Sequence, residues 1–380
     1  MLHSHLKVHR LKICIFVNVD WFILSHFTDY LAKIIAQNYD ITVLTLSTGR
    51  CDELRSMGLR VIEVDIDRGY SSIFFEIKAF IRIFSAIREV SPDILELITI
   101  KPVIYGGLVA KLLKIHKTVF YMSGLGTLFT FNTVFGSIKS KVVTLLYKFI
   151  MRRPLVRVIV ENDDDRNIFE TVVGLKAEKI HLIPGVGVNL DNFSPCIKSK
   201  SSNLRVALAS RLLYDKGILE FLSAAKMCKT KFPNVEFLLV GDIDKTNPAS
   251  LCDRDIEKLC KSGTVEALGH IADMASFLKT IDIFVLPSYR EGFPRVIMEA
   301  AATGLPVITT DVTGCRSAVI DNVTGIIVPP KNTQALAAAI TKLITSPNVR
   351  AEQSKNARIH AEREFDVNML TYDHINVWAP

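Results

Sequence analysis

The sequence predicts an α/β protein with two domains built on parallel β-sheets. Short apolar or β-branched runs recur along the chain, and the intervals between them leave room for helices. This alternation is typical of parallel sheets joined by right-handed crossovers. With 380 residues, the chain is also longer than one hydrophobic core usually spans.

Six runs in the first half are expected to form one sheet, namely residues 12–17, 41–46, 61–64, 94–97, 119–122 and 156–160. Strands of a second sheet are expected to begin at Arg205, Glu236, Val265, Ile283, Val307 and Ile326. The turn-rich segment 183–189 and the polar linker 198–203 lie between the two sets. We therefore assign residues 1–190 to a first domain and 191–357 to a second.

An anion site is predicted where the strand beginning at Ile283 ends. The next turn leads into a helix with Pro294 in its first turn, where a missing N–H costs nothing. The free N–H groups near Gly292 and Phe293 then lie at the carboxyl end of the strand. These donors and the helix dipole favour an anion, and Gly292 lets it approach the backbone closely.

Two glutamates flank the start of this helix. Glu291 lies just before it and Glu299 more than one turn into it. One carboxylate can accept hydrogen bonds from a hexose and the other from a ribose, which suits a sugar nucleotide. Glutamates are also common in first helical turns and on solvated faces, so this alternative stays open for the pair alone.

Two cations follow the strand that begins at Arg205. Arg211 and Lys216 are five residues apart, so they can straddle a diphosphate, with a planar fork of donors from Arg211 and a point charge from Lys216. Their chemistry would be to neutralise a leaving diphosphate. Cations in loops are often simply solvated, and that alternative also stays open for the pair alone.

The segment from Glu291-Gly-Phe-Pro through Glu299-Ala-Ala-Ala-Thr-Gly-Leu-Pro-Val resembles the signature of retaining family-4 glycosyltransferases. Arg211 and Lys216 match the Arg-x4-Lys pair of the same family. The resemblance implies the GT-B fold, with two Rossmann-like domains facing a central cleft. It also implies that the last helix, here in residues 358–380, crosses back to the first domain.

The resemblance further implies a role for each matched residue. Arg211 and Lys216 would hold the donor diphosphate and Glu291 would orient the sugar, so these three are the expected catalytic residues. The remaining expected contacts to the nucleotide sugar are Gly292, Phe293, Pro294, Glu299 at the ribose and Ile271 at the base. The family's chemistry is mainly electrostatic, so we expect neither a cofactor nor a metal.

Segments of the first half resemble those of bacterial family-4 enzymes that build O-antigens and capsules. The acceptor-side residues that this implies are Asp20, Lys101, Ser123 and Gly124. Many relatives carry histidines where Glu96 and Ser123 stand here, so a direct catalytic role for an imidazole of this domain is in doubt. The glycines can equally be tight turns after strands.

No Asp or Glu occurs in residues 97–160, although this interval contains ten Lys or Arg. Within it, residues 134–151 fit a helix whose apolar face is flanked by lysines, a pattern of interfacial membrane segments. The alternatives are a core-facing helix with solvated lysines, or nucleic-acid binding. Aromatic-basic RNA motifs are absent, so we expect residues 97–160 to contact an anionic membrane surface and expect no nucleic acid partner.

Other function classes find little support. No run reaches the roughly eighteen apolar residues of a membrane span, and the seven scattered cysteines give no disulfide framework and no paired metal spacing. Asp-x-Asp occurs four times, which shows how little that pattern means. We expect a cytoplasmic protein, peripheral on the inner face of the cell membrane.

Together these features predict a retaining glycosyltransferase. It would move a hexose or N-acetylhexosamine from a nucleotide sugar, UDP-linked, to a lipid-diphosphate-linked oligosaccharide in surface polysaccharide synthesis, such as lipopolysaccharide O-antigen or capsule. A GT-B nucleotide-sugar epimerase or hydrolase is one alternative, and a non-catalytic subunit of an assembly complex is another. Such a subunit has little reason to keep Arg211, Lys216, Glu291 and Glu299 together.

Overall fold

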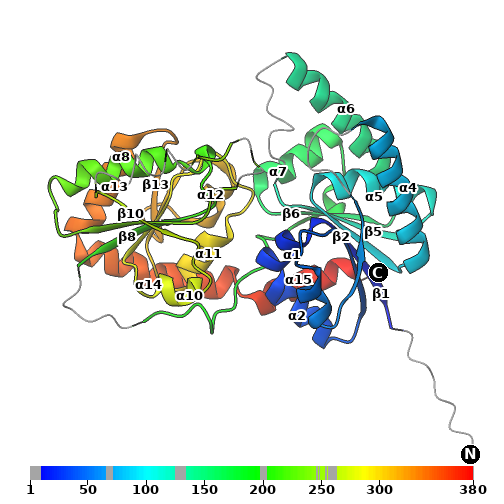
Figure 1. Cartoon of the computed structure of the whole chain (residues 1–380), viewed down its shortest axis with the longest axis horizontal. Helices are drawn as coiled ribbons and strands as arrows, with labels where there is room; N and C mark the ends of the chain where they lie inside the picture. Colours follow the sequence, from blue (N-terminus) through cyan, green and yellow to red (C-terminus); the bar gives the residue numbers. More distant parts are fainter. Residues whose placement is uncertain are drawn as a thin grey trace, which may run out of the picture. The chain divides into compact units, whose positions relative to one another are not determined.

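The chain forms two compact units in its computed structural model (Figure 1). The structure describes residues 10–65, 72–124, 134–196, 203–244, 247, 249–252, 255 and 263–379, and from 134 to 139 the backbone only. One unit comprises the residues up to Val186 together with those from Thr371 onward, and the other is Gly187–Leu370. The linker expected at 198–203 lies largely outside the described residues.

The first unit is built on a seven-stranded parallel sheet with the order β3-β2-β1-β4-β5-β6-β7. Its strands are β1 (Lys12–Val19), β2 (Asp40–Leu46), β3 (Arg60–Glu63), β4 (Ile94–Ile98), β5 (Lys117–Met122), β6 (Val156–Val160) and β7 (Ile180–Leu182). The six predicted runs are all strands. The sequence missed β7, a short edge strand whose three residues place a histidine between two apolar side chains.

Helices cover both faces of this sheet. They are α1 (Asp20–His26), α2 (Thr28–Ala36), α3 (Cys51–Ser56), α4 (Ile73–Val90), α5 (Ile100–Leu112), α6 (Val134–Met151), α7 (Asp163–Ile168) and the last helix α15 (Val367–Trp378), with short turns η1 (Phe169–Val173) and η2 (Ala177–Lys179). The helix predicted over 134–151 is α6. The helices α4, α5 and α6 lie side by side, and their buried faces form one core with β1, β4, β5 and β6.

The second unit contains a six-stranded parallel sheet with the order β10-β9-β8-β11-β12-β13. Its strands are β8 (Arg205–Ala209), β9 (Glu236–Val240), β10 (Glu266–Gly269), β11 (Ile283–Leu286), β12 (Val307–Thr310) and β13 (Gly325–Val328). Its described helices are η3 (Tyr214–Lys216), α8 (Ile218–Lys229), α10 (Met274–Leu278), α11 (Arg295–Ala302), α12 (Thr313–Ala318), α13 (Thr333–Thr345) and α14 (Pro347–Glu364).

Each sheet has a point at which the order of its strands reverses. In the first sheet this point lies between β1 and β4, and in the second it lies between β8 and β11. In open parallel sheets, ligands bind at such points, outside the carboxyl ends of the strands. The loops that follow these four strands are therefore the expected ligand-binding segments.

The C-terminal part of α15 packs against the first unit through aromatic side chains. The imidazole of His374 stacks on Tyr121, with ring centroids 5.4 Å apart, and shares a 3.0 Å hydrogen bond with the carbonyl oxygen of Gly185. Trp378 meets the ring of Tyr30 edge-on at 6.2 Å. Burial lowers the pKa of His374 to about 4, so this ring stays neutral at physiological pH.

Glu96 lies on β4 within the same buried region. It is fully buried and accepts a 3.4 Å hydrogen bond from the hydroxyl of Tyr30. Burial is the main cause that raises the pKa of Glu96, to about 7. The folded protein therefore holds this carboxyl protonated at mildly acidic pH, while the unfolded chain does not.

We predict that Glu96→Gln stabilises the protein increasingly as pH rises. The folded pKa lies above the unfolded value, so wild-type stability falls as pH increases from the unfolded pKa through 7, and the amide avoids this loss. Urea unfolding at pH 5 and pH 8.5 should show a larger gain at the higher pH. The exposed Glu89→Gln serves as control. An equal gain at both pH values would contradict the assignment.

Candidate functional site

The predicted catalytic residues follow the two strands that flank the reversal point of the second sheet. Arg211 and Lys216 come after β8, and Glu291 comes after β11. These two strands are hydrogen-bonded neighbours, with Val206 opposite Ile283. Their carboxyl ends therefore bring loops 75 residues apart in the chain to the same place.

Lys216 and Glu291 form an ion pair that links these two loops. The Nζ atom of Lys216 lies 2.6 Å from Oε1 of Glu291, and the hydroxyl of Ser288 donates to the same oxygen at 2.7 Å. The two side chains are only 16% and 11% exposed. Because water screens such a pair poorly, its charges interact strongly with each other and with any ligand beside them.

Close backbone packing fixes both loops around this pair. Gly217 has a φ of 70°, and a Cβ atom there would lie 2.0 Å from the carbonyl oxygen of Pro287. On the other side, Gly314 donates its N–H to the carbonyl oxygen of Glu291 at 3.3 Å. A Cβ atom at Gly314 would lie 2.0 Å from the carbonyl oxygen of Gly292.

Arg211 is more open to solvent than Lys216. Its guanidinium Nη1 lies 3.3 Å from Oδ2 of Asp244, which follows β9, and its side chain is 48% exposed. The half-exposed guanidinium is accessible to an anionic ligand from solvent.

The helix that follows Glu291 begins one residue later than predicted. Pro294 has a ψ of 107° and is the N-cap residue of α11, so its assignment to the first helical turn was wrong. Glu299 lies in α11, is nearly buried, and its Oε1 accepts a 2.9 Å hydrogen bond from Nε of Arg295. Phe293 packs edge-on against Phe365 at 5.7 Å.

Ile271 follows β10 at the same edge of the sheet. It is partly buried and packs against the core of the second unit. The loop before it is tied to the loop after β9, because the N–H of Gly241 donates to the carbonyl oxygen of Gly269 at 2.9 Å.

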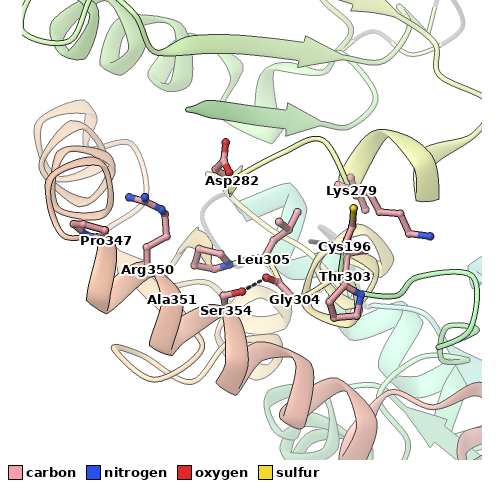
Figure 2. Close-up of a pocket in the computed structure, with 13 residues that line it drawn as sticks. Cys196, Lys279, Asp282, Thr303, Gly304, Leu305, Pro347, Arg350, Ala351 and Ser354 are labelled. Carbon is pink, nitrogen blue, oxygen red and sulfur yellow. Dashed lines mark hydrogen bonds between the residues drawn. The ribbon is translucent and has the colours of Figure 1, made fainter. Parts of the chain in front are cut away.

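A concavity at the opposite edge of this sheet does not resemble a site for the same chemistry (Figure 2). Asp282 and Arg350 contribute to its lining. The carboxylate of Asp282 accepts a 2.8 Å hydrogen bond from the N–H of Arg205, and Arg350 donates to the carbonyl oxygen of Leu343 at 2.5 Å. Asp282 and Arg350 thus support backbone, Lys279 is the remaining charged residue of the lining, and none of the predicted site residues lies there.

In the first unit, Asp20 begins α1 directly after β1. Its buried carboxylate accepts hydrogen bonds from the N–H groups of Trp21, Thr48 and Arg50 at 2.7 to 2.9 Å, and another from the hydroxyl of Thr48. Burial alone would raise the pKa of Asp20, but these hydrogen bonds outweigh it and lower that pKa. Asp20 therefore holds the loop before α3 and has little capacity left for an acceptor.

The other acceptor-side residues also follow strands of the first sheet. Lys101, in α5 after β4, pairs with Glu76 at 3.2 Å. Ser123 and Gly124 follow β5, while the next residues of that segment, 125–129, lie outside the described residues. Sequence reasoning overlooked Thr99, which has a φ of 75°, a strained value for a β-branched residue and one that no sequence pattern reveals.

Family models match both halves of the chain. The model described as "Glycosyl transferase 4-like" matches residues 12–153, and the one described as "Glycosyl transferases group 1" matches residues 195–360. The two matches together identify the chain as a glycosyltransferase. The glycosyltransferase thus carries the Lys216–Glu291 pair and Arg211 within the segment that matches the group 1 model.

Relatives of this glycosyltransferase extend along most of its length. It is 29% identical to the "N,N'-diacetylbacillosaminyl-diphospho-undecaprenol alpha-1,3-N-acetylgalactosaminyltransferase" of Campylobacter jejuni, over 93% of this chain and 94% of that one. It is 26% identical to the "UDP-Gal:alpha-D-GlcNAc-diphosphoundecaprenol alpha-1,3-galactosyltransferase" of Escherichia coli, over 87% and 86% of the two chains.

Solved structures confirm the predicted GT-B fold. A glycosyltransferase from Rickettsia africae has a TM-score of 0.79 at 18% identity, covering 97% of this chain and 98% of that one. Anabaena Alr3699/HepE in complex with UDP-glucose has a TM-score of 0.77 at 20% identity, covering 97% and 100%. At these identities the likeness concerns the fold alone.

We predict that Gly314→Ala removes most turnover while the protein remains folded. The new methyl group meets the backbone at Gly292, and overpacking of this kind costs about 1–3 kcal/mol. Displacing the Glu291 loop by about 1 Å can lower turnover on the order of 10²-fold. Turnover and thermal unfolding should be compared with Ser317→Ala on the same helix. Wild-type turnover in Gly314→Ala would show that this loop's position is unimportant.

Proposed function

We propose that this glycosyltransferase transfers a hexose or N-acetylhexosamine from a UDP-sugar to a lipid-diphosphate-linked glycan in surface polysaccharide synthesis. The observation that carries the proposal is the Lys216–Glu291 pair at the reversal point of the second sheet. It sets a cation and a carboxylate side by side, as a donor with a diphosphate next to a sugar requires. The Campylobacter and Escherichia relatives, named for undecaprenol-diphosphate acceptors, support the acceptor class.

In the proposed reaction the second unit binds the donor. Lys216 and Arg211 neutralise the charge that develops on the leaving diphosphate, since preorganised charges in a poorly hydrated site stabilise a transition state strongly. Glu291 accepts hydrogen bonds from the sugar, beside the cation that holds the phosphates. The backbone N–H groups near Gly292 and Phe293 add donors to the anion.

Two further residues of the second unit are proposed to bind the nucleoside part of the donor. Glu299 anchors the ribose and Ile271 contacts the base. We assign leaving-group stabilisation to side-chain cations, so the reaction should proceed without a metal and turnover should survive EDTA. Retention at the anomeric carbon is part of the proposal, and NMR of the product would test it.

We further propose that the first unit lies on the cytoplasmic face of the membrane. None of the helices among the described residues is long and apolar enough to cross a bilayer. However, α6 exposes apolar side chains that are 53% to 66% accessible, namely Val142, Leu145 and Phe149. The start of α4 also exposes apolar side chains, namely Ile73, Phe74, Ile77 and Ile81.

The α6 part of this apolar surface lies within the acid-free segment 97–160. Lys141 and Lys148 flank the exposed face of α6. Each basic residue near an anionic leaflet contributes about 1 kcal/mol of attraction, and apolar side chains insert at the interface. Lys139, also expected to take part, has a side chain that falls outside the described residues.

We predict that Arg211→Ala and Lys216→Ala each lower turnover on the order of 10²-fold. Arg211→Ala should keep its stability, because this side chain is half exposed, whereas Lys216→Ala should be less stable but still folded, because it leaves the mostly buried Glu291 without its cation. Turnover with a panel of UDP-sugars and a lipid-diphosphate acceptor measures the effect. Lys226→Ala, an exposed change on α8, is the matched control. Retained wild-type rates in both variants would refute the diphosphate assignment.

Membrane binding should depend on salt and on the charges of α6. The Debye length shrinks from about 10 Å at 0.1 M to 3 Å at 1 M, so anionic liposomes should sediment the protein at low salt and release much of it at high salt. Lys141→Glu combined with Lys148→Glu should reduce sedimentation. Lys226→Glu with Lys231→Glu in the second unit makes the same change of net charge and should not. Equal behaviour of the two double variants would rule out this surface.

A further inference from the structure

A basic concavity lies at the carboxyl ends of α5 and α6. It has a volume of about 300 Å³. Its lining residues are Lys111, Lys114, His116, Arg153, Pro154 and Leu155. These residues precede β5 and β6, so the concavity lies at the opposite edge of the sheet from Asp20, Ser123 and Gly124. None of the lining residues is a carboxylate.

Two of the cations are held in place by backbone carbonyl groups. The Nζ atom of Lys111 donates to the backbone carbonyl oxygen of Phe149 at 3.0 Å. It also lies over the aromatic ring of Phe149, 3.2 Å from the ring centroid. The guanidinium of Arg153 donates to the carbonyl oxygen of Ile115. These charges are therefore fixed at the concavity.

The side chains of Lys114 and His116 have no hydrogen-bond or ion-pair partner among the described residues. Lys114 also has a φ of 55°, at a position just past the end of α5 that usually belongs to glycine. A side chain in this conformation costs about 1 kcal/mol or more. The negative end of a helix dipole favours a cation at this position. Glycine, however, would avoid the strain of the positive φ.

Exposed apolar side chains continue from the rim of the concavity along α6. Leu112, next to Lys111 in the chain, is 62% exposed, Leu155 of the lining is 41% exposed, and Phe149 under Lys111 is 53% exposed. Leu145 and Val142 extend the same exposed face of α6. A free phosphate ion has no use for such a surface, whereas a phospholipid presents a phosphate directly beside apolar chains.

We propose that this concavity binds the phosphodiester headgroup of an anionic phospholipid. Lys114 and His116 contact the phosphate, Lys111 and Arg153 supply fixed positive charge, and the exposed face of α6 lies along the acyl chains. The inference rests on the proposed membrane-surface location of the first unit. It adds to that location a defined headgroup site, separate from the donor and acceptor sites.

Lys114→Gly tests this site without weakening the fold. Glycine relieves the backbone strain, so the melting temperature should stay equal or rise, while binding to phosphatidylglycerol-containing vesicles should weaken by more than the roughly five-fold expected for one diffuse surface charge. Lys141→Ala removes the same charge from α6 outside the concavity, and its effect should be about five-fold or less. Wild-type vesicle binding by Lys114→Gly would overturn the headgroup site. An equal loss of vesicle binding in Lys141→Ala would also overturn it, because binding would then depend only on diffuse surface charge.

Two further measurements separate this site from its alternatives. Inorganic phosphate should bind wild type and Lys114→Gly equally weakly in calorimetry, and tight, Lys114-dependent phosphate binding would replace the lipid by a free anion. Turnover on a detergent-solubilised acceptor should be the same in Lys114→Gly and wild type, since the concavity is not in the proposed catalytic site. A protein that binds these vesicles through Lys114 but transfers no sugar would retain the site and lose the proposed function.

Discussion

The ion pair between Lys216 and Glu291 is the interaction on which the donor site depends. It joins loops from the two strands at the reversal point of the second sheet. Removing one member of such a pair leaves a mostly buried charge without a partner, at a cost of up to about 3 kcal/mol. The close backbone packing at Gly217 and Gly314 holds each loop at the distance that the ion pair requires.

The same pair explains how one site can bind both the sugar and the diphosphate of a donor. A sugar offers hydroxyl donors, whereas a diphosphate carries negative charge. Lys216 and Glu291 provide a cation and an acceptor at adjacent points with little exposure, and Arg211 contributes a more accessible cation from the same loop. The parallel sheet makes this possible, because the carboxyl ends of neighbouring strands bring segments that are distant in sequence into contact.

Much of the fold was predictable because strand periodicity and chain order are local signals. The runs at β1 and β8 are short, apolar and well separated, so their strands could be placed within a residue or two. The contact of Lys216 with Glu291 could not be derived, since it depends on which strands are neighbours. Gly314 and Thr99 were missed for a related reason: their importance lies in a backbone approach and in a positive φ. Asp20 was noticed, but its hydrogen bonds make it a support for a loop.

A double-mutant cycle on kcat/KM is the most direct test of the central claim. Lys216→Met, Glu291→Gln and the double variant should be compared with wild type for sugar transfer from the preferred UDP-sugar. If the two residues act as one unit on the donor, the double variant should be about as slow as the slower single variant. Losses that simply multiply in the double variant would show that the two side chains act independently, and would contradict the account.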